Sequence, residues 1–163
     1  MPVASRLRCA VDLVYVGVGA NLGAREATIR RAIELLDEVP EIDVRRSSTL
    51  RETEPWGLED QPRFVNGAIE LETTLEPRRL LEELLAVERA LGRVREGERW
   101  GPRPIDLDLL VHGDRRVDEP GLTVPHPRLA ERRFALEPLV ELSPDLAIPG
   151  QGIASELLAR LNS

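Results

Sequence analysis

The sequence contains no lysine, and all 22 of its basic residues are arginine. A phosphate-binding loop of the Walker type, a Schiff-base lysine and a lysine acting as general base are therefore excluded. Any chemistry on phosphate groups must depend instead on arginine, on backbone amides or on a metal ion. The net charge of −7 also argues against a nucleic-acid-binding protein, because such proteins usually carry a basic stripe.

Cysteine is nearly absent as well, since Cys9 is the only one among 163 residues. No internal disulfide and no cysteine-based zinc site can form. No apolar run approaches the ~20 residues of a membrane span, and the first ten residues lack the apolar core of a signal peptide. We therefore expect a cytoplasmic protein that forms a single domain over residues 1–163.

Several common catalytic motifs are missing. The sequence has neither G-x-S-x-G nor H-E-x-x-H, and its two histidines, His112 and His126, are too few for a histidine-cluster metal site. The glycines of GVGANLG do not match a dinucleotide-binding fingerprint, because Gly23 falls one position late. A tight turn between a strand and a helix is the simplest interpretation of that segment. Nucleophilic catalysis by the protein itself has no good candidate.

The hydrophobic pattern predicts strands and helices in the order β-α-β-β-α-β. This order is the split β-α-β, or ferredoxin-like, pattern, and it predicts an α+β fold with a largely antiparallel sheet and helices packed on it. Two long polar loops interrupt the pattern, and loops of that length usually carry function. The strands are expected at 14–18, 42–50, 64–73 and 105–111, the helices at 20–39 and 77–91, and the loops at 51–63 and 92–104. A short edge strand is expected within 113–118, a helical segment over 125–142 and a last helix over 153–161.

Residues 99–113, RWGPRPIDLDLLVHG, contain two aspartates inside an apolar run. Asp106 and Asp108 would share one strand face, because side chains two positions apart point the same way. Carboxylates spaced ~6–7 Å along a strand suit Mg²⁺. Water and substrate phosphates usually complete the coordination shell of this ion. The alternative is a pair of aspartates on a solvated strand face, although aspartate is depleted in strands.

Four arginines crowd the loop that precedes the aspartates. Arginine binds phosphate oxygens bidentately, so this loop beside a carboxylate pair predicts phosphoryl transfer. Its glycines would let the loop close over a substrate. The alternative is a solvated loop neutralised by Glu96 and Glu98. Trp56 and Trp100 also fall in the two long loops, and we expect at least one of them to face a ligand. The arginines are Arg93, Arg95, Arg99 and Arg103.

Other side chains are candidates for binding. Glu88 lies on the apolar stripe of the second helix, where its carboxylate needs a partner, either an arginine of the protein or a ligand. Phe64 and Asn66 would share a strand face, where a ring can stack on a flat heterocycle and an amide can bind its edge. The alternative for these two is a core phenylalanine and a turn asparagine. His126, held between two prolines, could contact a triphosphate.

Together these blocks resemble the 6-hydroxymethyl-7,8-dihydropterin pyrophosphokinases of folate biosynthesis. The stretch GRVREGERWGPRPIDLDLL looks like the signature of that family. VGVGANLG, TEPWG, DQPRFVNGA and LTVPHPRLAERRFALEPL are similar to its other blocks in the same order, and the resemblance covers about residues 14–149. It implies a ferredoxin-like transferase that moves pyrophosphate from ATP to the pterin hydroxymethyl group and releases AMP.

The resemblance also implies roles for individual residues. Asp106 and Asp108 would bind two Mg²⁺ ions that bridge the ATP phosphates, while Arg93 and Arg103 would assist the transfer as the loop closes. Phe64 and Phe134 would sandwich the pterin ring. The residues implied for the pterin are Thr53, Glu54, Trp56, Phe64, Asn66, Trp100 and Phe134. Those implied for ATP are Glu88, Arg95, Trp100, Arg103, Leu109, Thr123, His126 and Arg132.

Two other functions fit the same residues. An acidic pair on a strand also serves a Mg²⁺-dependent nucleotidyltransferase, in which the acceptor attacks the α-phosphorus and pyrophosphate leaves. A ferredoxin-like fold can also be a small-ligand-binding module without catalysis. Such a module would have no reason to keep a metal-binding pair beside an arginine loop. We expect a monomer whose partners are ATP and the pterin, with neither nucleic acid nor membrane among them.

Overall fold

The computed structural model describes residues 11–20, 25–53, 64–92 and 105–162. A five-stranded sheet forms its centre, in the order β2-β4-β1-β5, with β3 also paired to β4. Every pair of neighbouring strands is antiparallel. The strands are β1 (Asp12–Ala20), β2 (Ile42–Ser47), β3 (Arg51–Thr53), β4 (Phe64–Thr73) and β5 (Asp106–His112).

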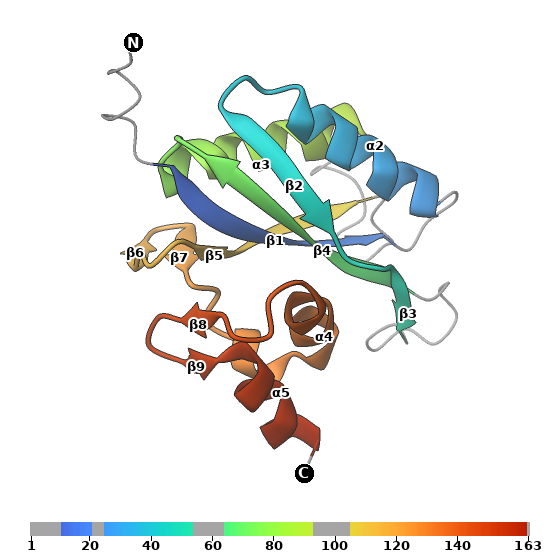
Figure 1. The fold of residues 1–163 in the computed structure, drawn as a ribbon. Helices are drawn as coiled ribbons and strands as arrows, with labels where there is room; N and C mark the ends of the chain where they lie inside the picture. Colours follow the sequence, from blue (N-terminus) through green and yellow to red (C-terminus); the bar gives the residue numbers. More distant parts are fainter. Residues whose placement is uncertain (1–10, 21–24, 54–63, 93–104, 163) are drawn as a thin grey trace.

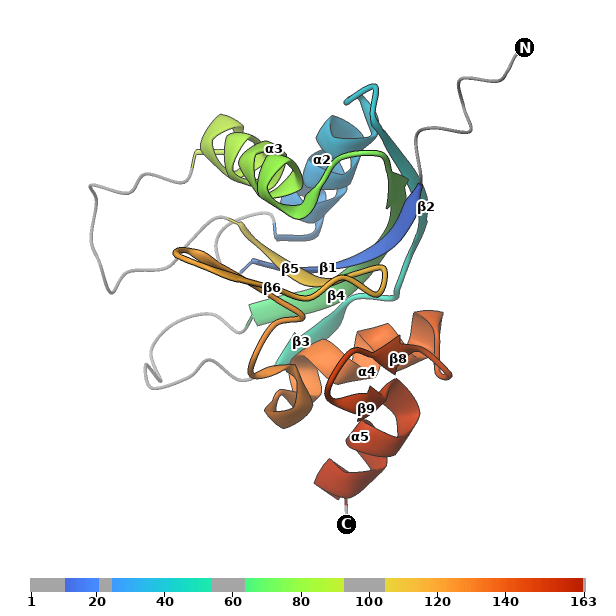
Figure 2. The same cartoon turned by 90° about the vertical axis from the view of Figure 1, so that its left-hand side faces the viewer.

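Helices cover both faces of this sheet (Figure 1). Helix α2 (Arg25–Asp37) connects β1 to β2, and α3 (Pro77–Ala90) connects β4 to β5. Each of these helices passes over a strand, because β4 lies between β1 and β2 while β1 lies between β4 and β5. Figure 2 shows α2 and α3 on one side of the sheet, with α4 (Arg133–Leu142) and α5 (Ala154–Asn162) on the other.

The strand sequences reflect this three-layer arrangement. In β1, Val16 and Val18 belong to the core beneath α2 and α3, whereas Tyr15 packs with residues of α4 and α5. A central strand that is buried on both faces therefore reads as a continuous apolar run. Strand β2 lies at the edge and exposes most of its residues. Helix α3 begins at Pro77, the first-turn position that proline favours.

Most predicted elements lie within a few residues of their expected positions, and β4 matches its expected range. The strand expected at 42–50 is shorter, because β2 ends at Ser47, and β3 begins at Arg51, inside the loop expected over 51–63. The edge strand expected within 113–118 is β6 (Val117–Glu119), which pairs with β7 (Leu122–Val124) in a separate hairpin.

The helical segment expected over 125–142 begins later than predicted. A single 3-10 turn, η1 (Leu129–Glu131), comes first, and helix α4 follows it. Pro125 and Pro127 explain the delay, since proline lacks the backbone N–H and disfavours helical geometry in the residue before it. The last helix, α5, follows a small hairpin of β8 (Ala147–Ile148) and β9 (Gly152–Ile153).

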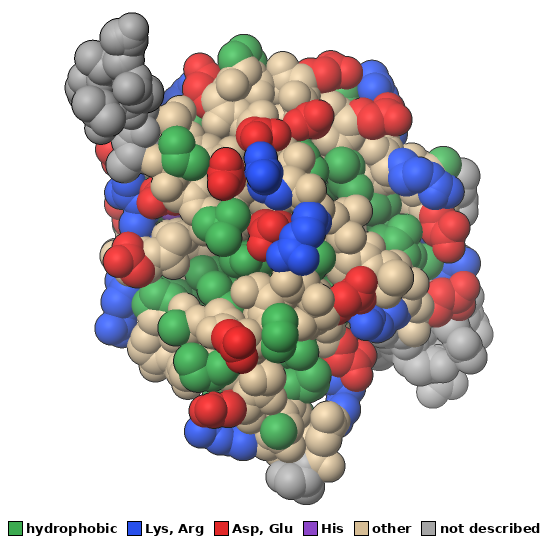
Figure 3. All heavy atoms as spheres, viewed as in Figure 1, with side chains coloured by type: hydrophobic (Ala, Val, Ile, Leu, Met, Phe, Trp, Pro, Cys, Tyr) green, Lys and Arg blue, Asp and Glu red, His purple; other side chains and the backbone are tan. Residues whose placement is uncertain are grey.

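Acidic and basic side chains are interspersed over the face that Figure 3 shows. Many form ion pairs between exposed side chains, such as Arg79 with Glu82 at 2.8 Å. Exposed pairs of this kind contribute little to stability, about 0–1 kcal/mol. Among the described residues, no helix is both long enough and apolar enough to cross a membrane.

A hydrogen-bonded network around the buried Glu70 joins the edge of the sheet to its centre and to α4. The Glu70 carboxylate accepts two hydrogen bonds of 2.9 Å from Arg46 and one of 2.6 Å from the Tyr15 hydroxyl. Arg46 also donates to the Leu142 carbonyl at the end of α4, at 2.6 Å. The bonds from Arg46 lower the pKa of Glu70. Burial and the bond to Glu70 raise the pKa of Tyr15 to about 12.

This network predicts a specific loss of stability in alkali. Tyr15 is the only tyrosine and the chain has no lysine, so few other groups titrate between pH 10 and 12. The unfolded chain releases the Tyr15 proton near pH 10, whereas the folded chain holds it until about pH 12. The stabilisation is therefore complete below pH 10, and the free energy of unfolding falls as the pH rises through this window.

Urea unfolding at several pH values between 9 and 12 measures this fall, with Tyr15→Phe as the control. In the wild-type chain we expect the free energy of unfolding to fall with pH at a slope that approaches the release of one proton per molecule. In Tyr15→Phe the fall should be much smaller. Equal slopes in the two proteins would mean that Tyr15 is not the group responsible.

Candidate active site

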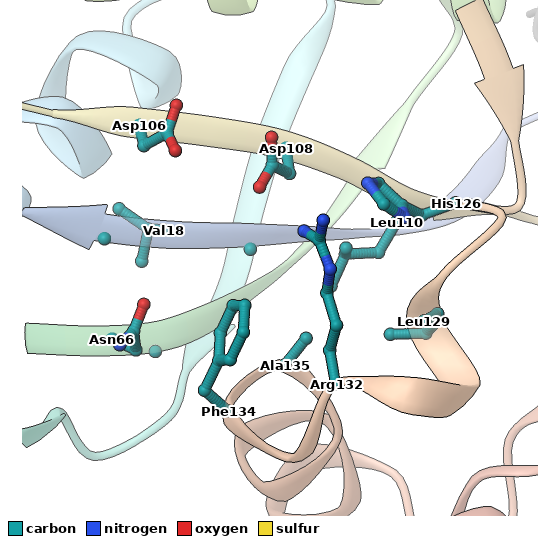
Figure 4. A pocket seen from close by; sticks show the side chains of 13 residues that line it. Val18, Asn66, Asp106, Asp108, Leu110, His126, Leu129, Arg132, Phe134 and Ala135 are labelled. Atoms are coloured by element: carbon teal, nitrogen blue, oxygen red, sulfur yellow. The ribbon is translucent and has the colours of Figure 1, made fainter. Parts of the chain in front are cut away.

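A cavity of about 150 Å³ opens on the α4 side of the sheet, where β4, β1 and β5 lie next to one another (Figure 4). The three strands supply one wall, and the segment from β7 into α4 supplies the other. Two carboxylates, an amide, an imidazole, a guanidinium and an aromatic ring all line it. These side chains are Asp106, Asp108, Asn66, His126, Arg132 and Phe134.

The two aspartates lie side by side on β5, and both line the cavity (Figure 4). Each is half-buried, while the alternating Leu107 and Leu109 pack in the core beneath α3. The structure thus confirms that the carboxylates share one strand face. Asp106 pairs with Gly19 of β1 and Asp108 with Gly17, so no β1 side chain separates the carboxylates from the cavity.

Gly17 lies in β1, as the strand expected at 14–18 predicts, and Gly19 also lies inside β1, so interpreting Gly19 as part of a turn was wrong. A Cβ atom added to Gly19 would lie 2.8 Å from Oδ1 of Asn66, the residue of β4 that pairs with Gly19. At Gly17 the nearest atom would be Leu110 Cδ1, at 3.4 Å. Only glycine at position 19 lets the Asn66 amide lie across β1. Glycine within a buried strand often marks the close approach of a ligand or another backbone, and this signal could have identified both residues.

Glu88 reaches the site region from α3. Its side chain is buried, and its carboxylate accepts a 2.7 Å hydrogen bond from the Leu107 backbone N–H. Leu107 lies between the two aspartates on β5, the last strand of the described order. The partner of the Glu88 carboxylate is thus a backbone N–H, and the sequence had suggested only an arginine or a ligand. The bond ties α3 to the strand segment that carries both carboxylates.

His126 and Arg132 come from the segment that precedes α4. The Nδ1 atom of His126 accepts a hydrogen bond of 3.1 Å from the Arg128 backbone N–H, so a neutral ring carries its proton on Nε2. Burial lowers the pKa of His126, as do the charges of Arg132 and Arg128. The ring is therefore neutral at pH 7. The Arg132 guanidinium lies 5.7 Å from the centre of the Phe134 ring and points toward β5 (Figure 4).

Other predicted site residues lie elsewhere. Leu109 packs in the core on the opposite face of the sheet, and Thr123 is exposed on β7, so neither side chain lines this cavity. Phe64 begins β4 opposite Thr53, but the structure describes only the backbone of these two residues. Six predicted residues fall outside the described ranges: Glu54, Trp56, Arg93, Arg95, Trp100 and Arg103.

Several known proteins are similar to this chain in sequence. The family model described as 7,8-dihydro-6-hydroxymethylpterin-pyrophosphokinase matches residues 15–144. Two curated relatives are named 2-amino-4-hydroxy-6-hydroxymethyldihydropteridine pyrophosphokinase. The one from Methylorubrum extorquens is 45% identical over 148 residues, which cover 91% of this chain and 92% of the relative. The one from Pseudomonas aeruginosa is 44% identical over 149 residues, which cover 91% of each.

A solved structure is similar in fold. The wild-type HPPK-DHPS of Plasmodium falciparum with pterin and p-hydroxybenzoate has a TM-score of 0.71 and 12% sequence identity. The alignment covers 93% of this chain and 42% of that one, so the present chain spans less than half of its length. At this identity the likeness concerns the fold alone. The match of the family model and of the curated relatives over most of the sequence shows that the chain belongs to the 7,8-dihydro-6-hydroxymethylpterin-pyrophosphokinase family.

Proposed function

We propose that this chain transfers pyrophosphate from ATP to the hydroxymethyl group of 6-hydroxymethyl-7,8-dihydropterin, which yields AMP and the pterin pyrophosphate for folate biosynthesis. The observation that carries the proposal is the cavity itself. It combines the carboxylates of Asp106 and Asp108 with the Asn66 amide and the Phe134 ring, in a chain of this family. ATP with its metal ions needs the two carboxylates, and the pterin needs the amide and the ring.

Two Mg²⁺ ions bound with ATP complete the proposal. Within the described ranges, no group of three or more His, Cys, Asp and Glu side chains could hold a metal ion. A pair of carboxylates still fits Mg²⁺, because this ion usually keeps waters and substrate phosphates in its shell. Asp106 and Asp108 would hold the ions, which neutralise phosphate charge when bound.

The cavity also suits the pterin. Asn66 offers an amide donor and acceptor to the edge of the heterocycle, and the Phe134 ring offers a stacking surface. Phe64, at the start of β4, would stack on the opposite face of the pterin. The proposal assigns the remaining pterin contacts to Thr53, Glu54, Trp56 and Trp100.

The reaction then requires positioning and electrostatic stabilisation. The pterin hydroxyl oxygen attacks the β-phosphorus of ATP and forms the new P–O bond. The bond from the β-phosphorus to the α,β-bridging oxygen breaks, AMP leaves with that oxygen, and the hydroxyl proton is released. Arg132 and His126 would donate hydrogen bonds to ATP, and the loop arginines Arg93, Arg95 and Arg103 would add positive charge around the transferred group.

The remaining assignments are also proposals. The strand order β2-β4-β1-β5, with α2 and α3 each passing over one strand, supports the split β-α-β, ferredoxin-like fold. We propose one domain over residues 1–163, with residues 1–11 as an extension, that works as a cytoplasmic monomer.

A product assay tests the reaction. Purified protein is incubated with ATP, Mg²⁺ and 6-hydroxymethyl-7,8-dihydropterin, and the products are separated by chromatography. We expect one AMP for each pterin pyrophosphate formed. Release of pyrophosphate with a nucleotidylated pterin would indicate a nucleotidyltransferase instead. Binding of both ligands without any product would favour a ligand-binding module.

The carboxylate pair predicts a large loss of activity upon substitution. Asp106→Asn and Asp108→Asn should each lower kcat by about 100-fold or more, because each removes a negative charge from the metal site. Thermal unfolding should change little, since both side chains are only half-buried. Asp118→Asn, at an exposed position on β6, is the matched control and should retain activity. Activity near the wild-type level in either cavity variant would rule out the metal assignment.

The fit of Asn66 against Gly19 predicts an effect on the pterin. Gly19→Ala should displace the Asn66 amide and raise the KM for the pterin by about tenfold, as expected from the loss of one or two hydrogen bonds. In a double-mutant cycle, Gly19→Ala should add little to the effect of Asn66→Ala, because both remove the same contact. Fully additive effects would mean that the new methyl group acts by another route.

A further inference from the structure

The backbone and ring of His126 are held by four hydrogen bonds. Its backbone N–H donates to the Leu110 carbonyl of β5 at 2.9 Å, and its Nδ1 accepts from the Arg128 N–H at 3.1 Å. Its backbone carbonyl accepts two bonds, one of 3.0 Å from the side-chain Nε2 of Gln151 and one of 3.2 Å from the Leu129 N–H. No bond to the ring Nε2–H is found within the part of the chain that the structure describes, and this group can serve a ligand in the cavity that His126 lines.

Gln151 comes from a distant and well-anchored segment. It lies in the turn between β8 and β9, beyond residues 15–144 of the family match. The Gln151 N–H donates to the Ile148 carbonyl at 2.9 Å, and the Ala154 N–H donates to the Leu146 carbonyl at 2.9 Å. Ile148 itself is buried in the core formed with α4 and α5. The side chain of Gln151 therefore extends to His126 from a backbone that these contacts hold in place.

The Nε2 atom of the Gln151 amide has a hydrogen-bond partner but the Oε1 atom has none in the described part of the chain, and this argues for a specific role. The Oε1 atom is also buried. A buried unpaired acceptor costs stability, whereas an apolar side chain of similar size would avoid that cost. Packing alone therefore does not account for glutamine at this position. The bond to His126 is the contact that an apolar residue could not make.

We propose that Gln151 is a positioning residue for nucleotide binding, and that its amide holds His126 so that the ring presents an Nε2–H donor to an acceptor oxygen of ATP. The proposal rests on the proposed function, in which His126 contacts ATP. The donor belongs to a neutral ring, so it selects the position of the nucleotide and adds no charge. Figure 4 shows His126 and Asn66 in different parts of the cavity, which separates this contact from pterin recognition.

Gln151→Met tests the proposal, because methionine keeps the size of the side chain and removes the donor. We expect the KM for ATP to rise about three- to tenfold, as for the loss of one hydrogen bond that orients a binding group. The values of kcat and of the KM for the pterin should stay within about twofold of wild type. In a double-mutant cycle with His126→Ala, Gln151→Met should have little further effect.

Ile148→Val is the matched control, since it loosens the same hairpin and leaves the bond from Gln151 to His126 in place. Its KM for ATP should remain at the wild-type value. Nuclear magnetic resonance of ¹⁵N-histidine-labelled protein gives a second readout, because the chain has only two histidines. In Gln151→Met the ring signals of His126 should shift or broaden, while those of His112 should not.

An unchanged KM for ATP in Gln151→Met would overturn the proposal, as would an equal rise in Ile148→Val. The wild-type product assay separates this outcome from failure of the proposed function. If the wild-type protein forms no AMP, the reaction assignment fails. Calorimetric binding of a non-hydrolysable ATP analogue to the same variants then still decides the role of Gln151.

Discussion

The antiparallel pairing of β1 with both β4 and β5 is the constraint on which the site depends. Its register aligns Asn66, Gly19 and Asp106 across three strands. A shift of β5 by one residue would turn Asp106 and Asp108 into the apolar core beneath α3 and expose the leucines between them. Moving two carboxylates into an apolar core costs far more than exposing an apolar side chain, so the residues of the site also help to specify the register.

Contacts from both helical layers hold the site together. On one side, Glu88 of α3 binds the peptide N–H between the aspartates. On the other side, Arg46 connects Glu70 of β4 to the last carbonyl of α4, and Glu141 near the end of α4 accepts two hydrogen bonds from Thr49. Helix α4 carries Phe134 at its beginning, so its attachment to the sheet helps to hold this ring against the cavity.

Local sequence patterns predicted strands β1, β2, β4, β5 and β6, the helices and the shared face of the aspartates. Those features depend on spacings of two or of three to four residues, which can be read along the chain. The placement of Asn66 and Asp106 on either side of Gly19 could not be predicted, because it depends on the pairing of β1 with two strands that are distant in the sequence. The acceptor role of Glu88 and the contact of Gln151 with His126 involve backbone groups, which leave no pattern in the side chains. Gly19 was misread because glycine serves equally well in a turn and beneath a closely packed side chain.

The bond from Glu88 to the Leu107 N–H also bears on which ions the site would accept. The bond restrains the peptide plane between the two carboxylates, so their separation on β5 is set by the strand. Ca²⁺ tolerates six to eight oxygens at variable distances, whereas Mg²⁺ demands a small octahedral shell. In the proposed reaction, a carboxylate pair on this restrained strand would favour the smaller ion. Selection by ionic radius would thus originate in a helix that does not touch the metal.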